Sequence, residues 1–94
     1  MDGERRRLED LLVIADRHVK VGGVLVDRQR TNIAALRRDG QSIELATKLL
    51  AELEQSLQLH IEDRKRLRRA LAKLSARYSS PKKKPRPLKG LGAN

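Results

Sequence analysis

Apolar side chains recur at intervals of three and four residues along the first 36 residues of the chain. The positions are Leu8, Leu12, Ala15, Val19, Gly22, Val26, Gln29, Ile33 and Leu36. An alternation of three and four without a slip is the heptad seam of a helix that packs lengthwise on another helix. The seam ends at Asp39-Gly40, a turn signal in which Gly40 suits the left-handed residue after a helix. The pattern predicts a helix over residues 3–38 and a turn over residues 39–42.

A second seam with the same spacing follows the turn. Its positions are Ile43, Ala46, Leu50, Leu53, Leu57, His60, Arg64, Leu67, Leu71, Leu74 and Tyr78. Ser42 is a good N-cap residue for this helix, which we expect over residues 43–78. The short connection predicts an all-α antiparallel two-helix hairpin, coiled-coil-like, as one domain over residues 1–78. Residues that face each other across it should have numbers that sum to about 82, which sets Gln29 against Leu53.

Each predicted helix also carries apolar residues beside its seam. They are Leu11, Ile14, Val21 and Leu25 in the first helix, and Leu45, Leu49, Leu59 and Ile61 in the second. A hairpin of two helices cannot bury both stripes, so the sequence predicts self-association as a dimer, or docking on another protein. Within this set Leu11, Leu25, Leu45, Leu49 and Leu59 are the predicted interface. The alternative is that they are scattered exposed leucines, which are common on protein surfaces.

Four seam positions are not apolar: Gly22, Gln29, His60 and Arg64. We expect them to form a polar layer that fixes the helix register, with Gly22 making room for the ring of His60. A metal site using His18, His60 and a nearby Asp16 or Asp63 is the alternative, but the spacing matches no ligand motif. No nucleophile constellation or phosphate-binding loop is evident, so we expect no cofactor, no metal and no enzymatic activity.

Residues 79–94 differ in composition from the rest of the chain. They contain all three prolines, five basic residues and no acidic residue, and predict a disordered, basic tail. The whole chain has a net charge of +10, one aromatic residue and no cysteine. The N-terminal apolar run, Leu11 to Ala15, is too short for a signal peptide, and no stretch is long enough to span a bilayer. The expected location is the cytoplasm.

Twelve basic residues follow Asp63, the last acidic residue of the chain. They are Arg64, Lys65, Arg66, Arg68, Arg69, Lys73, Arg77, Lys82, Lys83, Lys84, Arg86 and Lys89. Such a cluster can neutralise nucleic-acid phosphates and release counterions, which predicts weak, salt-dependent binding without sequence preference. An acidic protein is a second candidate partner, and an anionic membrane surface is a weaker third because no apolar anchor accompanies the charge. The alternative is that the tail is a solvated terminus without a ligand.

Several short motifs are similar to those of a group of short alphaproteobacterial proteins. They are Asp27-Arg28-Gln29-Arg30, Arg38-Asp39-Gly40, Leu49-Leu50, Glu54, Leu59-His60 and Asp63-Arg64. The resemblance covers about residues 15–67 and leaves out the tail. It implies a helical hairpin and supplies no activity. Where that group often has His-Ile this chain has Leu25-Val26, so a role for such a histidine is absent here.

Overall fold

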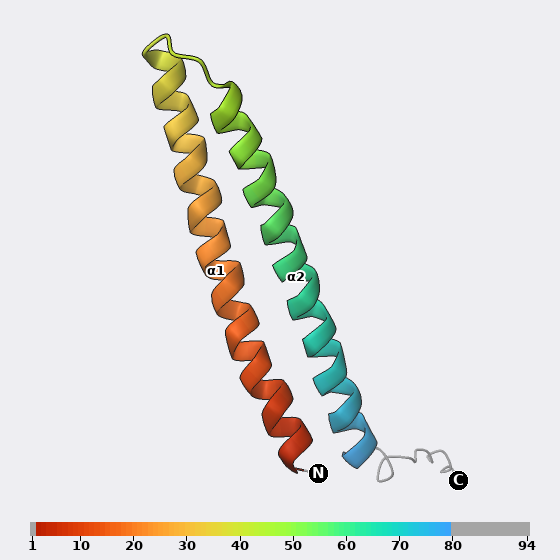
Figure 1. Cartoon of the computed structure of the whole chain (residues 1–94). Coiled ribbons are helices and arrows are strands. Elements are labelled where there is room, and N and C mark those ends of the chain that lie inside the picture. The colour runs from red at the N-terminus through yellow and green to blue at the C-terminus, as the bar shows by residue number, and fades with distance from the viewer. Residues whose placement is uncertain (1, 80–94) are drawn as a thin grey trace, which may run out of the picture.

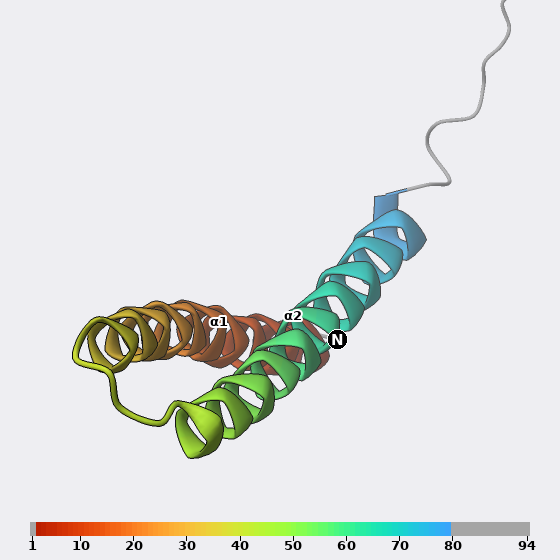
Figure 2. The same cartoon turned by 90° about the horizontal axis from the view of Figure 1, so that it is seen from above.

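Two long helices account for nearly all of the part of the chain that the structure describes, residues 2–79. The computed structural model has α1 over Asp2–Arg38 and α2 over Glu44–Ser79. The helices lie side by side and antiparallel, with the turn at one end and both helix termini at the other (Figure 1). Seen from above, the two axes are inclined to each other (Figure 2). The predicted all-α hairpin is confirmed, with helix boundaries within one residue of those expected.

The C-terminus of α1 is closed by the hydrogen bonds of a Schellman motif. Gly40 has a φ of 73°, the left-handed conformation that glycine adopts without a Cβ clash. The Gln41 N–H donates to the Leu36 carbonyl at 2.9 Å, and the Gly40 N–H donates to the Arg37 carbonyl at 3.1 Å. These bonds use carbonyls that the end of the helix leaves without helical partners. The predicted role of Gly40 is therefore confirmed.

The start of α2 differs from the prediction by one residue. The carbonyl of Ile43, not that of Ser42, accepts a hydrogen bond from the Thr47 N–H, at 2.8 Å. Ser42 therefore stands one position before the N-cap. Its hydroxyl oxygen still accepts a hydrogen bond from the Glu44 N–H, at a long 3.5 Å. The N-cap assignment of Ser42 was wrong because propensity identifies the capping residue type and not the residue at which the backbone becomes helical.

The seam predicted from the sequence is the line along which the helices meet. Every seam residue from Leu8 to Leu74 is buried or half-buried; the side chain of Tyr78, the last seam position, lies outside the described part. Only four apolar side chains among residues 3–77 are buried: Ala15, Val26, Ile33 and Leu74. A core this thin supplies little of the apolar burial that stabilises a folded domain.

The register of the hairpin differs locally from the expected one. A Cβ added at Gly22 would lie 3.1 Å from Leu57 Cδ1, so the space at Gly22 is filled by Leu57 and not by the ring of His60. His60 instead stacks obliquely on His18, with ring centroids 4.8 Å apart. Rigid pairing by residue number was wrong here by about one helical turn, because the Cα of Leu57 itself lies 3.8 Å from the added Cβ and the backbones are therefore offset from the expected register.

Charge is distributed unevenly along the hairpin. The half next to the helix termini, residues 2–22 and 61–79, holds 12 basic and seven acidic residues. The half next to the turn, residues 23–60, holds five of each. The hairpin is therefore positive at one end and neutral at the other.

Candidate interaction surfaces

The hairpin has two faces, and the order of residues along each helix separates them. Residues that directly follow a seam residue lie on one flank of a helix, and residues that directly precede one lie on the opposite flank. Two antiparallel helices are related by a two-fold axis perpendicular to the plane that contains them. Rotation about this axis exchanges the helices but keeps each face of the pair on its own side. The preceding flanks of α1 and α2 therefore share one face, and the following flanks share the other.

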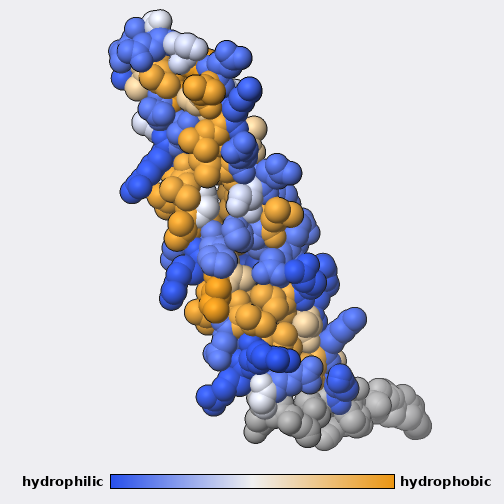
Figure 3. All heavy atoms as spheres, in the orientation of Figure 1, coloured by the Kyte–Doolittle hydropathy of each residue, from blue (hydrophilic) through white to orange (hydrophobic). Residues whose placement is uncertain are grey.

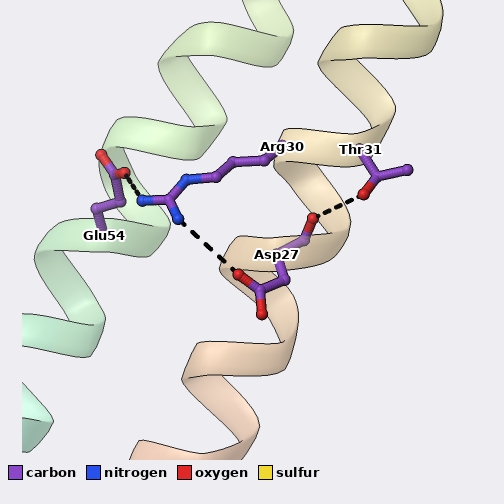
Figure 4. A network of polar contacts seen from close by, with 4 residues as sticks. All are labelled: Asp27, Arg30, Thr31 and Glu54. Atoms are coloured by element: carbon purple, nitrogen blue, oxygen red, sulfur yellow. Dashed lines mark hydrogen bonds and ion pairs between the residues drawn. The ribbon is translucent and has the colours of Figure 1, made fainter.

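The face formed by the following flanks carries the ion pairs between the helices. Arg30 of α1 donates to Glu54 of α2 at 2.8 Å and also approaches Asp27 at 3.9 Å (Figure 4). Thr31 adds a hydroxyl hydrogen bond to the Asp27 carbonyl. The Arg30 and Glu54 side chains are about half exposed, so their attraction is screened by solvent. These contacts occupy the face and align the two helices there.

Asp16 joins two arginines on the same face. Its Oδ1 lies 3.6 Å from Arg64 Nη1 and 3.7 Å from Arg68 Nη2. The Nε atom of Arg64 is buried and has no hydrogen-bond partner within residues 2–79. Arg64 and Arg68 thus connect α2 to α1, and their charge is partly neutralised by Asp16.

The face formed by the preceding flanks carries most of the exposed large apolar side chains. In the described part of the chain nine large apolar side chains are exposed. Seven of them directly precede a seam residue: Leu11, Ile14, Val21, Leu25, Leu45, Leu49 and Leu59. We call this set the apolar face. Only Val13 and Val24 of the nine lie elsewhere. Figure 3 shows hydrophobic surface along both helices, divided by a hydrophilic band.

The predicted interface residues are therefore brought together on one side of the molecule. Leu11, Leu25, Leu45, Leu49 and Leu59 are all exposed, and Leu45 is the most exposed at 80%. Ile61, which the sequence grouped with them, directly follows His60 and lies half-buried on the other face. The sequence contained the signal that separates Ile61 from the rest, namely its position after a seam residue and not before one.

A shallow groove crosses the apolar face at mid-hairpin. Its lining includes Val21, Gly22 and Leu25 of α1 with Ser56 and Leu57 of α2, and the two histidines, His18 and His60. Gly22 contributes no side chain to this lining, and Leu57 packs directly against it. The groove is apolar on its walls and has imidazoles at one edge, so it suits an apolar side chain from a partner better than a charged ligand.

The expected polar layer is not a single layer. Gln29, only 9% exposed, donates from Nε2 to the Ala46 carbonyl at 2.8 Å, toward the turn. Gly22 and His60 share the groove, and Arg64 pairs with Asp16 nearer the termini. The four polar seam residues are therefore spread over several helical turns. Their side chains find partners at separate levels.

The basic residues of α2 divide into two groups. Besides Arg64 and Arg68, Lys65 lies 3.8 Å from Glu62 and Arg66 pairs with Asp63. Arg69, Lys73 and Arg77 form no ion pair within residues 2–79, and they are exposed. Their four-residue spacing sets them along one side of α2. Lys82, Lys83, Lys84, Arg86 and Lys89 lie outside the described residues.

The N-terminal end of α1 adds cations beside this group. Arg5, Arg6 and Arg7 also form no ion pair with the side chains of residues 3–77, and Arg6 and Arg7 are exposed. The antiparallel pairing brings them to the end of the hairpin where α2 finishes (Figure 1). We define the basic end as Arg5, Arg6, Arg7, Arg69, Lys73 and Arg77. Its α1 members were not among the predicted binding residues, although a run of three arginines was visible in the sequence.

Other kinds of site have little support in the described residues. Between residues 2 and 79 no group of three or more histidine, cysteine or acidic side chains is placed to hold a metal ion. No helix in that range is long and apolar enough to cross a membrane. Comparison with protein-family models, with curated proteins and with solved structures finds no match to this chain. Function must therefore be argued from the two surfaces themselves.

Proposed function

We propose that this protein is a non-enzymatic interaction protein whose basic end binds the phosphate backbone of nucleic acid. The observation that supports it is the group of six cations at one end of the hairpin, none of which forms an ion pair with an acidic side chain among residues 3–77. Cations already paired with carboxylates would lose those contacts on binding phosphate. Unpaired cations lose none and release counterions from the nucleic acid, which favours binding.

The binding we propose is electrostatic and independent of base sequence. Arg69, Lys73 and Arg77 project from one side of a rigid helix, and the five basic residues after position 80 extend the charge. The chain has a single aromatic residue, so base stacking on a single strand contributes little. The helices are too long, and joined too sharply, for a helix-turn-helix reader of the major groove. Duplex phosphates are the ligand that this end suits best.

The test compares two triple variants of equal net charge. The first replaces Arg69, Lys73 and Arg77 with alanine; the matched control replaces Arg37, Arg38 and Lys48, three cations near the turn that also form no ion pair among residues 2–79. Each lost phosphate contact should reduce the slope of log affinity against log salt by about one. We expect the first variant to lose roughly three units of slope on a DNA duplex and the control to lose little. Equal losses in both would show that only net charge matters and would refute a localised site.

A second function is supported by a separate observation, the gathering of seven exposed apolar side chains on one face. Exposed apolar side chains gathered on one face of a small protein favour a protein partner. In this alternative the protein is an adaptor or a self-assembling helical module that binds through the apolar face. Changing Leu45, Leu49 and Leu59 to polar residues should abolish such binding, whereas ending the chain at Ser80 should weaken nucleic-acid binding and leave protein binding intact. If the truncation abolished protein binding and the leucine substitutions did not, the basic end and not the apolar face would be the protein-binding surface.

A further inference from the structure

The hairpin offers an uncovered face large enough for a stable interface. Two helices of about 36 residues at 1.5 Å per residue, each about 10 Å wide, present a face of roughly 1,000 Å². A standard protein interface covers about 800 Å² on each partner. The seam leaves only four apolar side chains buried in the described part, so this face holds most of the large apolar side chains that a second layer of structure could cover.

We propose that a second copy of this chain covers the apolar face, in a two-fold symmetric pair that sets the turn of each hairpin over the helix termini of the other. The inference rests on the second of the two proposed functions, in which the apolar face is the binding surface, and it specifies the partner. The product is a four-helix arrangement with one apolar layer between two hairpins.

The charge distribution favours opposite orientation of the two copies. With both hairpins pointing the same way, two ends that each carry a net charge of +5 would lie together. With the hairpins reversed, each positive end lies over a turn half whose five basic and five acidic residues give no net charge. Like charges brought together at an interface cost free energy, and the reversed orientation avoids that cost.

The level of the symmetry axis follows from the residues on the apolar face. Gly22 adjoins Leu57, and Asp16 pairs with Arg64. Val21 of α1 and Leu59 of α2 therefore lie at nearly the same position along the long axis of the hairpin. In α2, Glu52 and Arg66 each lie seven residues from Leu59 on the same flank. An axis at the level of Leu59 therefore sets Glu52 of one copy against Arg66 of the other. It also sets Leu45 against the aliphatic stem of Lys73.

The groove makes this surface self-complementary. The groove between α1 and α2 provides the hollow, and Val21 and Leu25 line it from the same flank of α1. With the axis at Val21, Leu25 of the second copy arrives close to His18 at the edge of the groove. A two-fold interface needs a projection and a hollow close to the axis, because each copy supplies both.

The C-terminal segment of the same chain is a less suitable occupant. To reach the apolar face from Ser79, its five basic residues would have to pass along Arg66, Lys73 and Arg77, which lie on the same flank of α2. Repulsion between these like charges opposes that path. An acidic amphipathic helix from another protein would fit the charge, and the experiments below separate it from a second copy.

The first experiment measures association of the full chain by sedimentation over a range of concentrations. Val21→Arg is compared with Val24→Arg, because the two valines are nearly equally exposed, at 50% and 46%, but only Val21 is on the apolar face. We expect a wild-type dimer whose dissociation constant rises by about 30-fold or more in Val21→Arg and by less than about threefold in Val24→Arg. A wild-type monomer throughout, or equal effects of the two substitutions, would overturn the proposal.

The second experiment tests the orientation and does not depend on a charged substitution that could impair folding. The chain has no cysteine, so single cysteines can be introduced and oxidised. Leu59→Cys, at the axis, should form a disulfide-linked dimer. Leu45→Cys should not, because 14 residues from the axis places the two copies of that residue about 42 Å apart. Crosslinking at position 45 with none at 59 would reject the reversed pairing.

The nucleic-acid proposal is judged by its own measurement. A monomeric chain that still binds duplex DNA would remove the second copy and leave the basic end in place. A dimer that binds no DNA would remove the proposed role of the basic end and leave the second copy in place.

Discussion

Gly22 and Gly23 are adjacent residues of α1 with different surroundings. A Cβ added at Gly23 meets nothing within 4 Å, whereas one added at Gly22 would press on Leu57 at 3.1 Å. Both glycines weaken the helix relative to alanine, and only Gly22 gains from close packing in return. The same sequence feature, a glycine in the middle of a helix, thus has a packing cause at one position and none in the described part at the next.

We predict that Gly23→Ala stabilises the protein more than Gly22→Ala does. Gly23→Ala should raise the free energy of unfolding by about 1 kcal/mol, because it gains helix propensity without a clash. Gly22→Ala should gain less, because Leu57 must shift by a few tenths of an ångström. Thermal denaturation followed by circular dichroism checks the order. A Gly22→Ala protein as stable as Gly23→Ala would show that the approach of Leu57 is unimportant.

Gly40 gives a third glycine with a different cause. Nothing lies within 4 Å of an added Cβ there, but the φ of 73° disfavours any residue with a side chain. Gly40→Ala should therefore destabilise the hairpin by about 1–2 kcal/mol. Loss of helical signal at lower urea concentration is the measurement. A neutral Gly40→Ala would mean that the turn relaxes to another conformation without cost.

At the scale of the helices, the ion pairs align the structure more than they stabilise it. Arg30 and Glu54 are 58% and 46% exposed. Exposed pairs of this kind typically contribute less than about 1 kcal/mol. A double-mutant cycle with Arg30→Ala and Glu54→Ala should give a coupling of about 0.5 kcal/mol that falls as salt is added. A coupling that is larger and independent of salt would contradict this ranking.

The heptad seams determine most of what the sequence could predict. Alternating spacing fixed the two helices to within a residue, and Asp39-Gly40 located the turn. The register was harder to predict, because Leu57 and His60 are one turn apart and both lie on the seam. Which one fills the space at Gly22 depends on the inclination of the helices, and no local pattern encodes that angle. Likewise, that Arg64 pairs with Asp16 is a property of the folded pair.

The apolar face shows the other limit of prediction from sequence. The seven residues of the apolar face were identified from their positions beside the seams. That they share one face follows from a further pattern, because each precedes a seam residue. Ile61 was misplaced for want of this distinction. The partner that covers the face cannot be predicted in this way, because patterns within one chain describe only the surface that this chain contributes.

At the scale of the whole molecule, the hairpin places two chemically different surfaces at defined places. The apolar face runs along both helices, and the basic end collects cations from α1 and α2 where the helices finish. In the reversed pair that we propose, the two basic ends lie at opposite ends of the dimer. Such a dimer has two separate binding sites for phosphate backbone, and could hold two duplex segments at once.

The most direct test of the proposed function is the affinity of the full chain for a generic DNA duplex as a function of salt concentration. We predict measurable binding at low salt. The logarithm of the association constant should fall linearly with the logarithm of the salt concentration, with a slope that corresponds to several phosphate contacts. Removal of residues 80–94 should reduce both the affinity and the slope. Absence of binding at low salt, or an affinity that does not change with salt, would contradict the account.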